Sequence, residues 1–199
     1  MKYIQGTIGL PLILSIDNSG NIKWYVDAYF AVHKDMRSHT GGLMTMGTVG
    51  AYVQSRKKKL NTKSSTEADL VGVDDVLTQV IWTRYFLKEQ GHMIQDNVIY
   101  QDNQSAIRLE NNGKRSRSKR TRHINIKYYF ITDRIMKHEA SMEFCPTFDM
   151  IGDYFTKALQ GSQFHRFRNI VLGIHEDKIP DYNASGRALL EERKLKLKK

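Results

Sequence analysis

Four acidic residues stand at positions where a carboxylate could take part in chemistry. Asp27 lies inside the aromatic segment WYVDAYF (24–30), and Asp102 follows the apolar run VIY (98–100). Glu67 and Asp153 fall in the first turns of expected helices. An acid within a strand is disfavoured unless it faces a cleft. Because converging carboxylates repel one another, such a cluster makes sense mainly as a site for hard cations such as Mg²⁺.

Each of these acids also has a purely structural interpretation. Asp27 could face solvent on an edge strand, and Asp102 could cap the helix that follows it. The pattern Ser64-x-x-Glu67 fits a capping box, and Asp153 could favour the positive end of a helix. Taken singly, Glu67 and Asp153 are better explained in these structural terms.

Hydrophobic periodicity predicts the elements that must position the acids. Alternation indicates a strand over 20–30 and a hairpin over 41–57 that turns at 47–50. Helical spacing predicts a long helix that starts at Ser64 and stops near Gly91. A strand at 98–100, a short helix, a second long helix over 124–135, a strand over 140–147 and a helix over 149–159 then follow. This order predicts an α/β fold, a mixed sheet with helices packed on its faces.

Length and composition indicate one domain of ordinary size with an appendage. The chain has 199 residues, of which 40% are hydrophobic and 26% charged, as in globular proteins. No apolar run approaches the roughly 18 residues that span a bilayer, and Gly6, Gly9 and Pro11 interrupt the apolar start. We therefore expect no membrane partner and no signal peptide. The single Cys145 cannot form an internal disulfide and fits a reducing compartment.

The charge balance favours a polyanionic partner. There are 31 Lys and Arg residues against 21 Asp and Glu, a formal net charge of +10, and the runs 55–63 and 112–123 contain no acid. Such clusters are typical of phosphate binding, although solvated loops are the simpler alternative. The candidate phosphate contacts are Arg115, Arg117, Lys119, Arg120, Arg122 and His123.

Two further segments offer candidate nucleic-acid contacts. Ser64, Ser65 and Thr66 could present backbone N–H groups and hydroxyls to a phosphate, although plain helix capping explains them about as well. Asn103 and Gln104, beside Asp102, could contact base edges or the 2′-hydroxyls that distinguish RNA from DNA.

Five segments together resemble a known family. YVDAYFA, LNTKSSTEADL, YQDNQSAI, KRTRHINIKYYFI and MIGDYFTKAL resemble successive blocks of the RNase H domain of copia-type LTR retrotransposon Pol polyproteins, over about residues 1–172. The resemblance implies an RNase H-like fold whose mixed five-stranded sheet begins with three antiparallel strands. It places the family's catalytic, metal-binding acids on Asp27, Glu67, Asp102 and Asp153. It also implies two Mg²⁺ ions, with Mn²⁺ as a substitute, and RNA–DNA hybrids as substrate.

The resemblance carries expectations about organisation as well. KYIQGTIGL resembles the linker after reverse transcriptase, so residues 1–18 are expected to be a linker remnant and an upstream reverse transcriptase domain a partner. Residues 19–160 would form the RNase H-like domain and 161–199 a basic appendage. The expected location is a cytoplasmic retrotransposon particle or the nucleus, without secretion.

Some residues depart from the family pattern, and rival functions remain open. Tyr29 stands where many relatives have a second acid, Ala158 where Pro is common, and CPTFD (145–149) lacks the His that other RNase H enzymes often carry before the last helix. The main rival is a catalytically idle module that only clamps nucleic acid, and another is a DNA-cutting relative of the same fold. The intact acids favour a ribonuclease, because a clamp does not need four of them.

Overall fold

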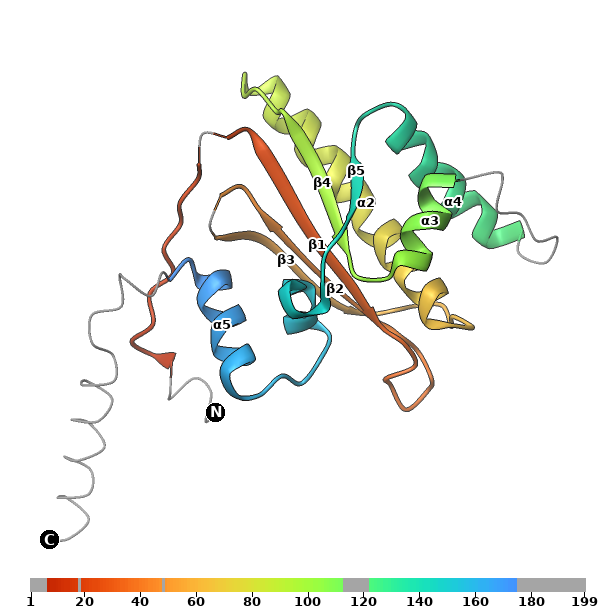
Figure 1. The fold of residues 1–199 in the computed structure, drawn as a ribbon, viewed down its shortest axis with the longest axis horizontal. Helices are drawn as coiled ribbons and strands as arrows, with labels where there is room; N and C mark the ends of the chain where they lie inside the picture. The colour runs from red at the N-terminus through yellow and green to blue at the C-terminus, as the bar shows by residue number, and fades with distance from the viewer. Residues whose placement is uncertain (1–6, 18, 48, 113–121, 175–199) are drawn as a thin grey trace, which may run out of the picture.

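The computed structural model describes residues 7–17, 19–47, 49–112 and 122–174, with only the backbone for 112 and 122–128. Its centre is a five-stranded sheet in the order β3-β2-β1-β4-β5 (Figure 1). β1 pairs antiparallel with β2, and β2 with β3, whereas β4 runs parallel to both β1 and β5. The bounds are Asn21–Tyr29 for β1, His39–Thr45 for β2, Gly50–Lys57 for β3, Asp96–Gln101 for β4 and Ser141–Phe144 for β5. The predicted α/β fold with a mixed sheet is confirmed.

The main core lies between one face of the sheet and two helices. These are α2 (Ser65–Glu89) and α4 (Arg122–Met136). Ile22, Trp24 and Val26 alternate along β1 and point to this face, because successive strand side chains face opposite sides. Trp24 is fully buried, and its indole N–H donates to Asn97 Oδ1 on the neighbouring β4 at 3.0 Å. The odd-numbered residues of β1, including Asp27, therefore face the other side.

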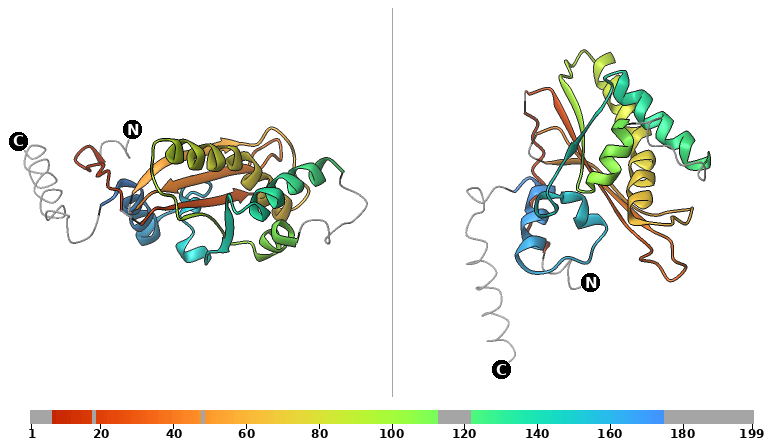
Figure 2. Two further views of the ribbon diagram at one scale, coloured as in Figure 1. Left: turned by 90° about the horizontal axis from the view of Figure 1, so that it is seen from above. Right: turned by 45° about the vertical axis from the view of Figure 1, so that its right-hand side comes forward.

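A smaller core covers that second face. Figure 2 shows α5 (Gly161–Leu172) on the side of the sheet opposite α2. Phe167 of α5 is fully buried and packs with Leu43 of β2 and with Ile151. The N–H of Ile13 donates to Leu172 O at 2.9 Å, so the N-terminal segment contacts α5 as well. The boundary expected at residue 160 therefore does not end the packed core, which continues through α5.

The helix predicted over 149–159 is not an α-helix. The structure has two short 3₁₀ turns, η2 (Thr147–Asp149) and η3 (Ile151–Phe155). Met150, Ile151, Gly152 and Asp153 are consecutive buried residues, whereas an α-helix on a sheet would turn some of them outward. Gly152 permits the close approach, since a Cβ there would come within 3.1 Å of the Asp27 nitrogen.

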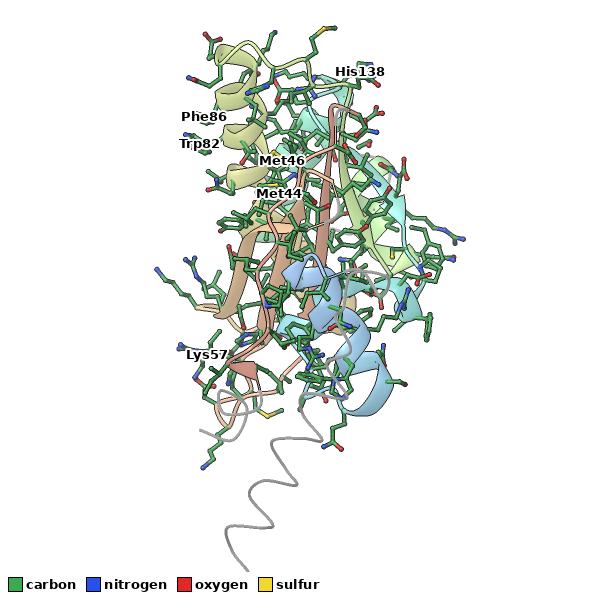
Figure 3. The ribbon with its side chains drawn as sticks, turned by 90° about the vertical axis from the view of Figure 1, so that its left-hand side faces the viewer. Met44, Met46, Lys57, Trp82, Phe86 and His138 are labelled. Carbon is green, nitrogen blue, oxygen red and sulfur yellow. The ribbon has the colours of Figure 1, made fainter. Side chains whose placement is uncertain are left out.

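The outer side of α2 carries an exposed aromatic pair. Trp82 and Phe86 stack with ring centroids 4.9 Å apart and are 55% and 46% exposed (Figure 3). Within the described ranges, no helix is both long and apolar enough to cross a bilayer.

Candidate metal centre

Two of the predicted acids meet where parallel strands end. The register pairs Tyr25 of β1 with Tyr100 of β4, so two residues further along each strand Asp27 comes beside Asp102. Tyr25 and Tyr100 stack with centroids 5.1 Å apart, which fixes this spacing on the same face. The carboxyl ends of parallel strands are the usual place for a binding site in α/β sheets. The strand pairing alone thus brings together acids that are far apart in sequence.

A third acid reaches the same place from η3. One carboxylate oxygen each of Asp27, Asp102 and Asp153 lies within 4.8 Å of the other two. Asp27 and Asp153 are buried, and Asp102 is half-buried. Thr156 Oγ1 donates to Asp27 Oδ2, and Thr147 Oγ1 donates to Asp102 Oδ2 at 3.1 Å. The hydroxyls of Thr147, the first residue of η2, and of Thr156, just after η3, therefore orient two of the three carboxylates.

A lysine lies against this acid triad. Lys157 Nζ donates to Asp153 Oδ1 at 2.7 Å and lies 3.9 Å from Asp27 Oδ2. Because Lys157 is four residues after Asp153, the local backbone turn brings the two side chains together. The triad therefore carries a cation of its own within the described chain.

The electrostatics of the triad disfavour full ionisation. Burial raises the pKa of Asp27, and Asp102 raises it further, against the opposing effects of Lys157 and Thr156. Burial also raises the pKa of Asp153 to about 6, with Asp27 and Asp102 adding to the rise and Lys157 opposing it. Two unit charges 4.8 Å apart repel by about 3 kcal/mol at an effective dielectric constant near 20. A nearby cation would therefore stabilise each pair of ionised acids in the triad.

Glu67 does not belong to this triad. Its carboxylate accepts from the backbone N–H of Lys63 at 2.9 Å, while Ser64 Oγ accepts from the N–H of Glu67 at 3.1 Å. Ser64 thus caps α2 as the sequence also allowed, although the Glu67 carboxylate accepts from Lys63, one residue before the N-cap N–H that a capping box uses. The structure thus brings together three of the four predicted acids and places the fourth at the start of α2.

Asp69, which the sequence analysis passed over, faces the triad instead. It is buried, and Asn103 Nδ2 donates to its Oδ2 at 2.8 Å. Burial raises the pKa of Asp69 to about 7, with repulsion from Asp27 and Asp102 adding to the effect. The missed signal was helical spacing, since Asp69 shares a helix face with Val73 and other fully buried valines.

Asn103, and not Asp102, caps the following helix, α3 (Gln104–Asn112). Its Oδ1 accepts from the backbone N–H groups of Ser105 at 3.0 Å and Ala106 at 3.3 Å. Asp102 is therefore free of the capping role and points its Oδ2 toward Thr147. The Asn103 side chain is thus bonded both to the start of α3 and to Asp69, and it is half-buried.

The donor set fits a hard divalent cation. Asp27, Asp102 and Asp153 offer carboxylate oxygens at mutual distances that one ion or a close pair could bridge, with Asp69 beside them. Mg²⁺ prefers such oxygen ligands and usually keeps several waters. Asp102 is half-buried, so solvent reaches part of this group of acids.

The predicted nucleic-acid contacts are only partly described. Gln104, Ser64 and Ser65 are exposed, and Thr66 is half-buried. Arg122 and His123 belong to the first turn of α4, with no described side chains. The other predicted contacts, Arg115, Arg117, Lys119 and Arg120, lie outside the described residues.

Strand order, strand directions and acids at the carboxyl ends of β1 and β4 define an RNase H-like domain. No protein-family model matches the chain. It is 30% identical over 178 residues to the retrovirus-related Pol polyprotein from transposon TNT 1-94 of Nicotiana tabacum, which covers 89% of this chain. The corresponding polyprotein from transposon RE1 of Arabidopsis thaliana is 31% identical over 170 residues, or 84% of this chain. Homologues over most of the chain are thus copia-type retrovirus-related Pol polyproteins, which confirms the resemblance.

The chain spans 13% and 11% of the length of these two relatives. Among solved structures, LC11-RNase H1 isolated from compost aligns with 64% of this chain and 86% of its own, at 12% identity and a TM-score of 0.46. The prototype foamy virus protease–reverse transcriptase aligns with 83% of this chain and 22% of its own, at 9% identity and a TM-score of 0.45.

Proposed function

We propose that this chain is a ribonuclease H that hydrolyses the RNA strand of RNA–DNA hybrids in a divalent-metal-dependent reaction. The observation that carries the proposal is the convergence of Asp27, Asp102 and Asp153 at the carboxyl ends of two parallel strands. Similarity to a retrovirus-related Pol polyprotein over 89% of this chain supports the same proposal. A module that only bound nucleic acid would have no need of mutually repelling buried acids.

In this proposal each side chain has a defined task. Asp27, Asp102 and Asp153, with Asp69 beside them, would hold two Mg²⁺ ions. When bound, the ions supply an activated water and stabilise the leaving oxygen of the phosphodiester. Thr156 orients the carboxylate of Asp27, and Asn103 orients that of Asp69.

The substrate and the partner follow from charge and homology. A net charge of +10 favours a polyanion, and Lys and Arg contacts to the backbone of a hybrid need not read its sequence. Because the relatives are much longer Pol polyproteins, we infer that a reverse transcriptase segment precedes this one in the parent protein. We expect the reaction to take place in an intracellular retrotransposon particle.

The decisive experiment compares wild type with Asp102→Asn on a labelled RNA–DNA hybrid in Mg²⁺, alongside single-stranded RNA and duplex DNA. The substitution preserves size but removes the charge that a hard cation needs. Hybrid cleavage should fall by orders of magnitude while the thermal midpoint in EDTA stays equal or rises. Asp96→Asn is the matched control, because Asp96 is an exposed aspartate of the same strand, β4.

The remaining outcomes separate the rival functions. An active Asp102→Asn protein would refute the metal centre. An inactive wild type that still binds the hybrid would support the idle clamp, and cleavage of duplex DNA would support a DNA-cutting relative of the fold.

A further inference from the structure

The ammonium of Lys157 lies against two of the three acids of the triad. Its Nζ is 2.7 Å from Asp153 Oδ1 and 3.9 Å from Asp27 Oδ2. Both acid side chains are almost completely buried, with 3% and 5% of their surface exposed. Lys157 therefore lies beside two negative carboxylates that are largely shielded from solvent and offsets their charge.

A second lysine–aspartate pair of the same spacing shows the contrast. Lys137 Nζ lies 2.9 Å from Asp133 Oδ2, also four residues apart, but those side chains are 54% and 37% exposed. Exposed pairs of this kind contribute little, since water screens both charges. The Lys157 pair differs in burial and in having a second buried acid within reach.

An ammonium and a divalent ion cannot share these oxygens at close range. Mg²⁺ sits about 2.0–2.1 Å from its oxygen ligands, closer than the 2.7 Å between Lys157 Nζ and Asp153 Oδ1. An ion on Asp27 and Asp153 would therefore meet the like charge of Lys157 within a few ångströms. Lys157 has a flexible four-carbon stem and a side chain 32% exposed, so it has a path to solvent.

We propose that Lys157 is a resident counter-cation, which holds the cation position of the metal-free site and withdraws when a divalent ion binds. Lys157 thereby sets the metal affinity of the centre. The inference rests on the proposed metal site, and it adds a competitor for that site within the chain itself. Before a metal ion binds, the ion pair with Lys157 keeps the buried acids neutralised. Metal binding therefore requires the loss of this ion pair.

The test measures Mg²⁺ binding by titration calorimetry and thermal midpoints in EDTA, on the whole chain. Lys157→Met keeps an unbranched stem of four heavy atoms and removes the ammonium, whereas Lys157→Arg keeps the charge. Lys157→Met should bind Mg²⁺ about tenfold more tightly or better, because a like charge next to the ion is gone. The same variant should melt at a lower temperature than wild type in EDTA. Lys157→Arg should stay near wild type in both measurements.

Lys137→Met is the matched control and should change neither quantity. Equal or weaker Mg²⁺ affinity in Lys157→Met would overturn the counter-cation while leaving the metal site intact. If neither wild type nor Lys157→Met binds Mg²⁺, the metal site itself fails and the inference fails with it. An unchanged midpoint of Lys157→Met in EDTA would show that the ion pair does not balance the acids before loading.

Discussion

Asp69→Asn should stabilise the metal-free protein, and the gain should depend on pH. Burial, with repulsion from Asp27 and Asp102, raises the pKa of Asp69 from its ordinary 3.8 to about 7. Below about pH 4 the carboxyl is protonated in both the folded and the unfolded chain, so it has no effect on stability. Between pH 4 and 7 the unfolded chain ionises first, so stability falls as the pH rises, and the full penalty is present above pH 7.

The size of the effect follows from that pKa. One pKa unit corresponds to about 1.4 kcal/mol, so a pKa of about 7 in place of 3.8 means a penalty of up to about 4 kcal/mol above pH 7. Asparagine is neutral, and its carbonyl oxygen can still accept from Asn103 Nδ2. For a chain of 199 residues, 1 kcal/mol moves the thermal midpoint by about 2–4 °C. We therefore expect a rise on the order of 10 °C at pH 8 and almost none at pH 4.

The assay is thermal unfolding of both proteins in EDTA, at a series of pH values from 4 to 8. Asp96→Asn, an exposed aspartate, should give no such pH-dependent gain. A gain of equal size at every pH would refute the electrostatic origin of the penalty. A loss of stability at pH 8 would show that Asp69 is stabilised by its surroundings as a carboxylate.

Three further predictions concern neighbouring groups. Glu67→Gln should leave Mg²⁺-dependent hybrid cleavage near wild type, because the Gln side chain can still accept from the backbone N–H of Lys63, and a loss as large as that expected for Asp102→Asn would return Glu67 to the metal centre. Asn103→Ala should lower the free energy of unfolding by about 1–2 kcal/mol, because the helix cap is lost. It should also lower hybrid cleavage, because Asp69 loses its hydrogen bond from Asn103. A denaturant midpoint equal to wild type would contradict the capping role. Replacing Arg117, Lys119 and Arg120 by Ala should flatten the salt dependence of hybrid binding by about 0.7–0.9 in log–log slope for each lost phosphate contact, and an unchanged slope would make the run a solvated loop.

Much of the scaffold was predictable because it depends on local patterns. The alternation in β1, the turn between β2 and β3 and the apolar spacing of α2 each indicate an element without knowledge of its neighbours. Asp27 and Asp102 stood out for the same reason, since an acid inside or just after an apolar strand is locally unusual. Family resemblance then supplied Asp153, whose own surroundings in the sequence suggested only a helix end.

The errors arose where tertiary contacts outweigh local patterns. Glu67 and Asp69 are two residues apart at one helix start, and only the packing of α2 decides which of them faces β1 and β4. The segment 149–159 has a hydrophobic pattern compatible with an α-helix, yet it packs closely on the sheet and forms the short 3₁₀ turns η2 and η3 instead. A Cβ at Gly41 would lie 2.6 Å from Thr156 Cγ2, which shows how closely the segment packs there. Asn103 caps α3, a role that the sequence analysis had left open only as the structural alternative for Asp102, because the two adjacent residues are equally able to cap.

The attachment of η3 to the sheet has a consequence for local stability. Asp27 is held within a five-stranded ladder, whereas Asp153 belongs to a short 3₁₀ turn that packs on the sheet outside that ladder, where Ser55 Oγ donates to Phe155 O at 2.9 Å. Such a segment can open in amide hydrogen exchange at a lower free energy than the strands beneath it. An ion that bridges Asp27 and Asp153 would tie this opening to metal release, because a ligand stabilises only the form that binds it. Mg²⁺ should then slow amide exchange across residues 150–157 more than in β1 or β4, and the wall of the site would become rigid only when the ion is present.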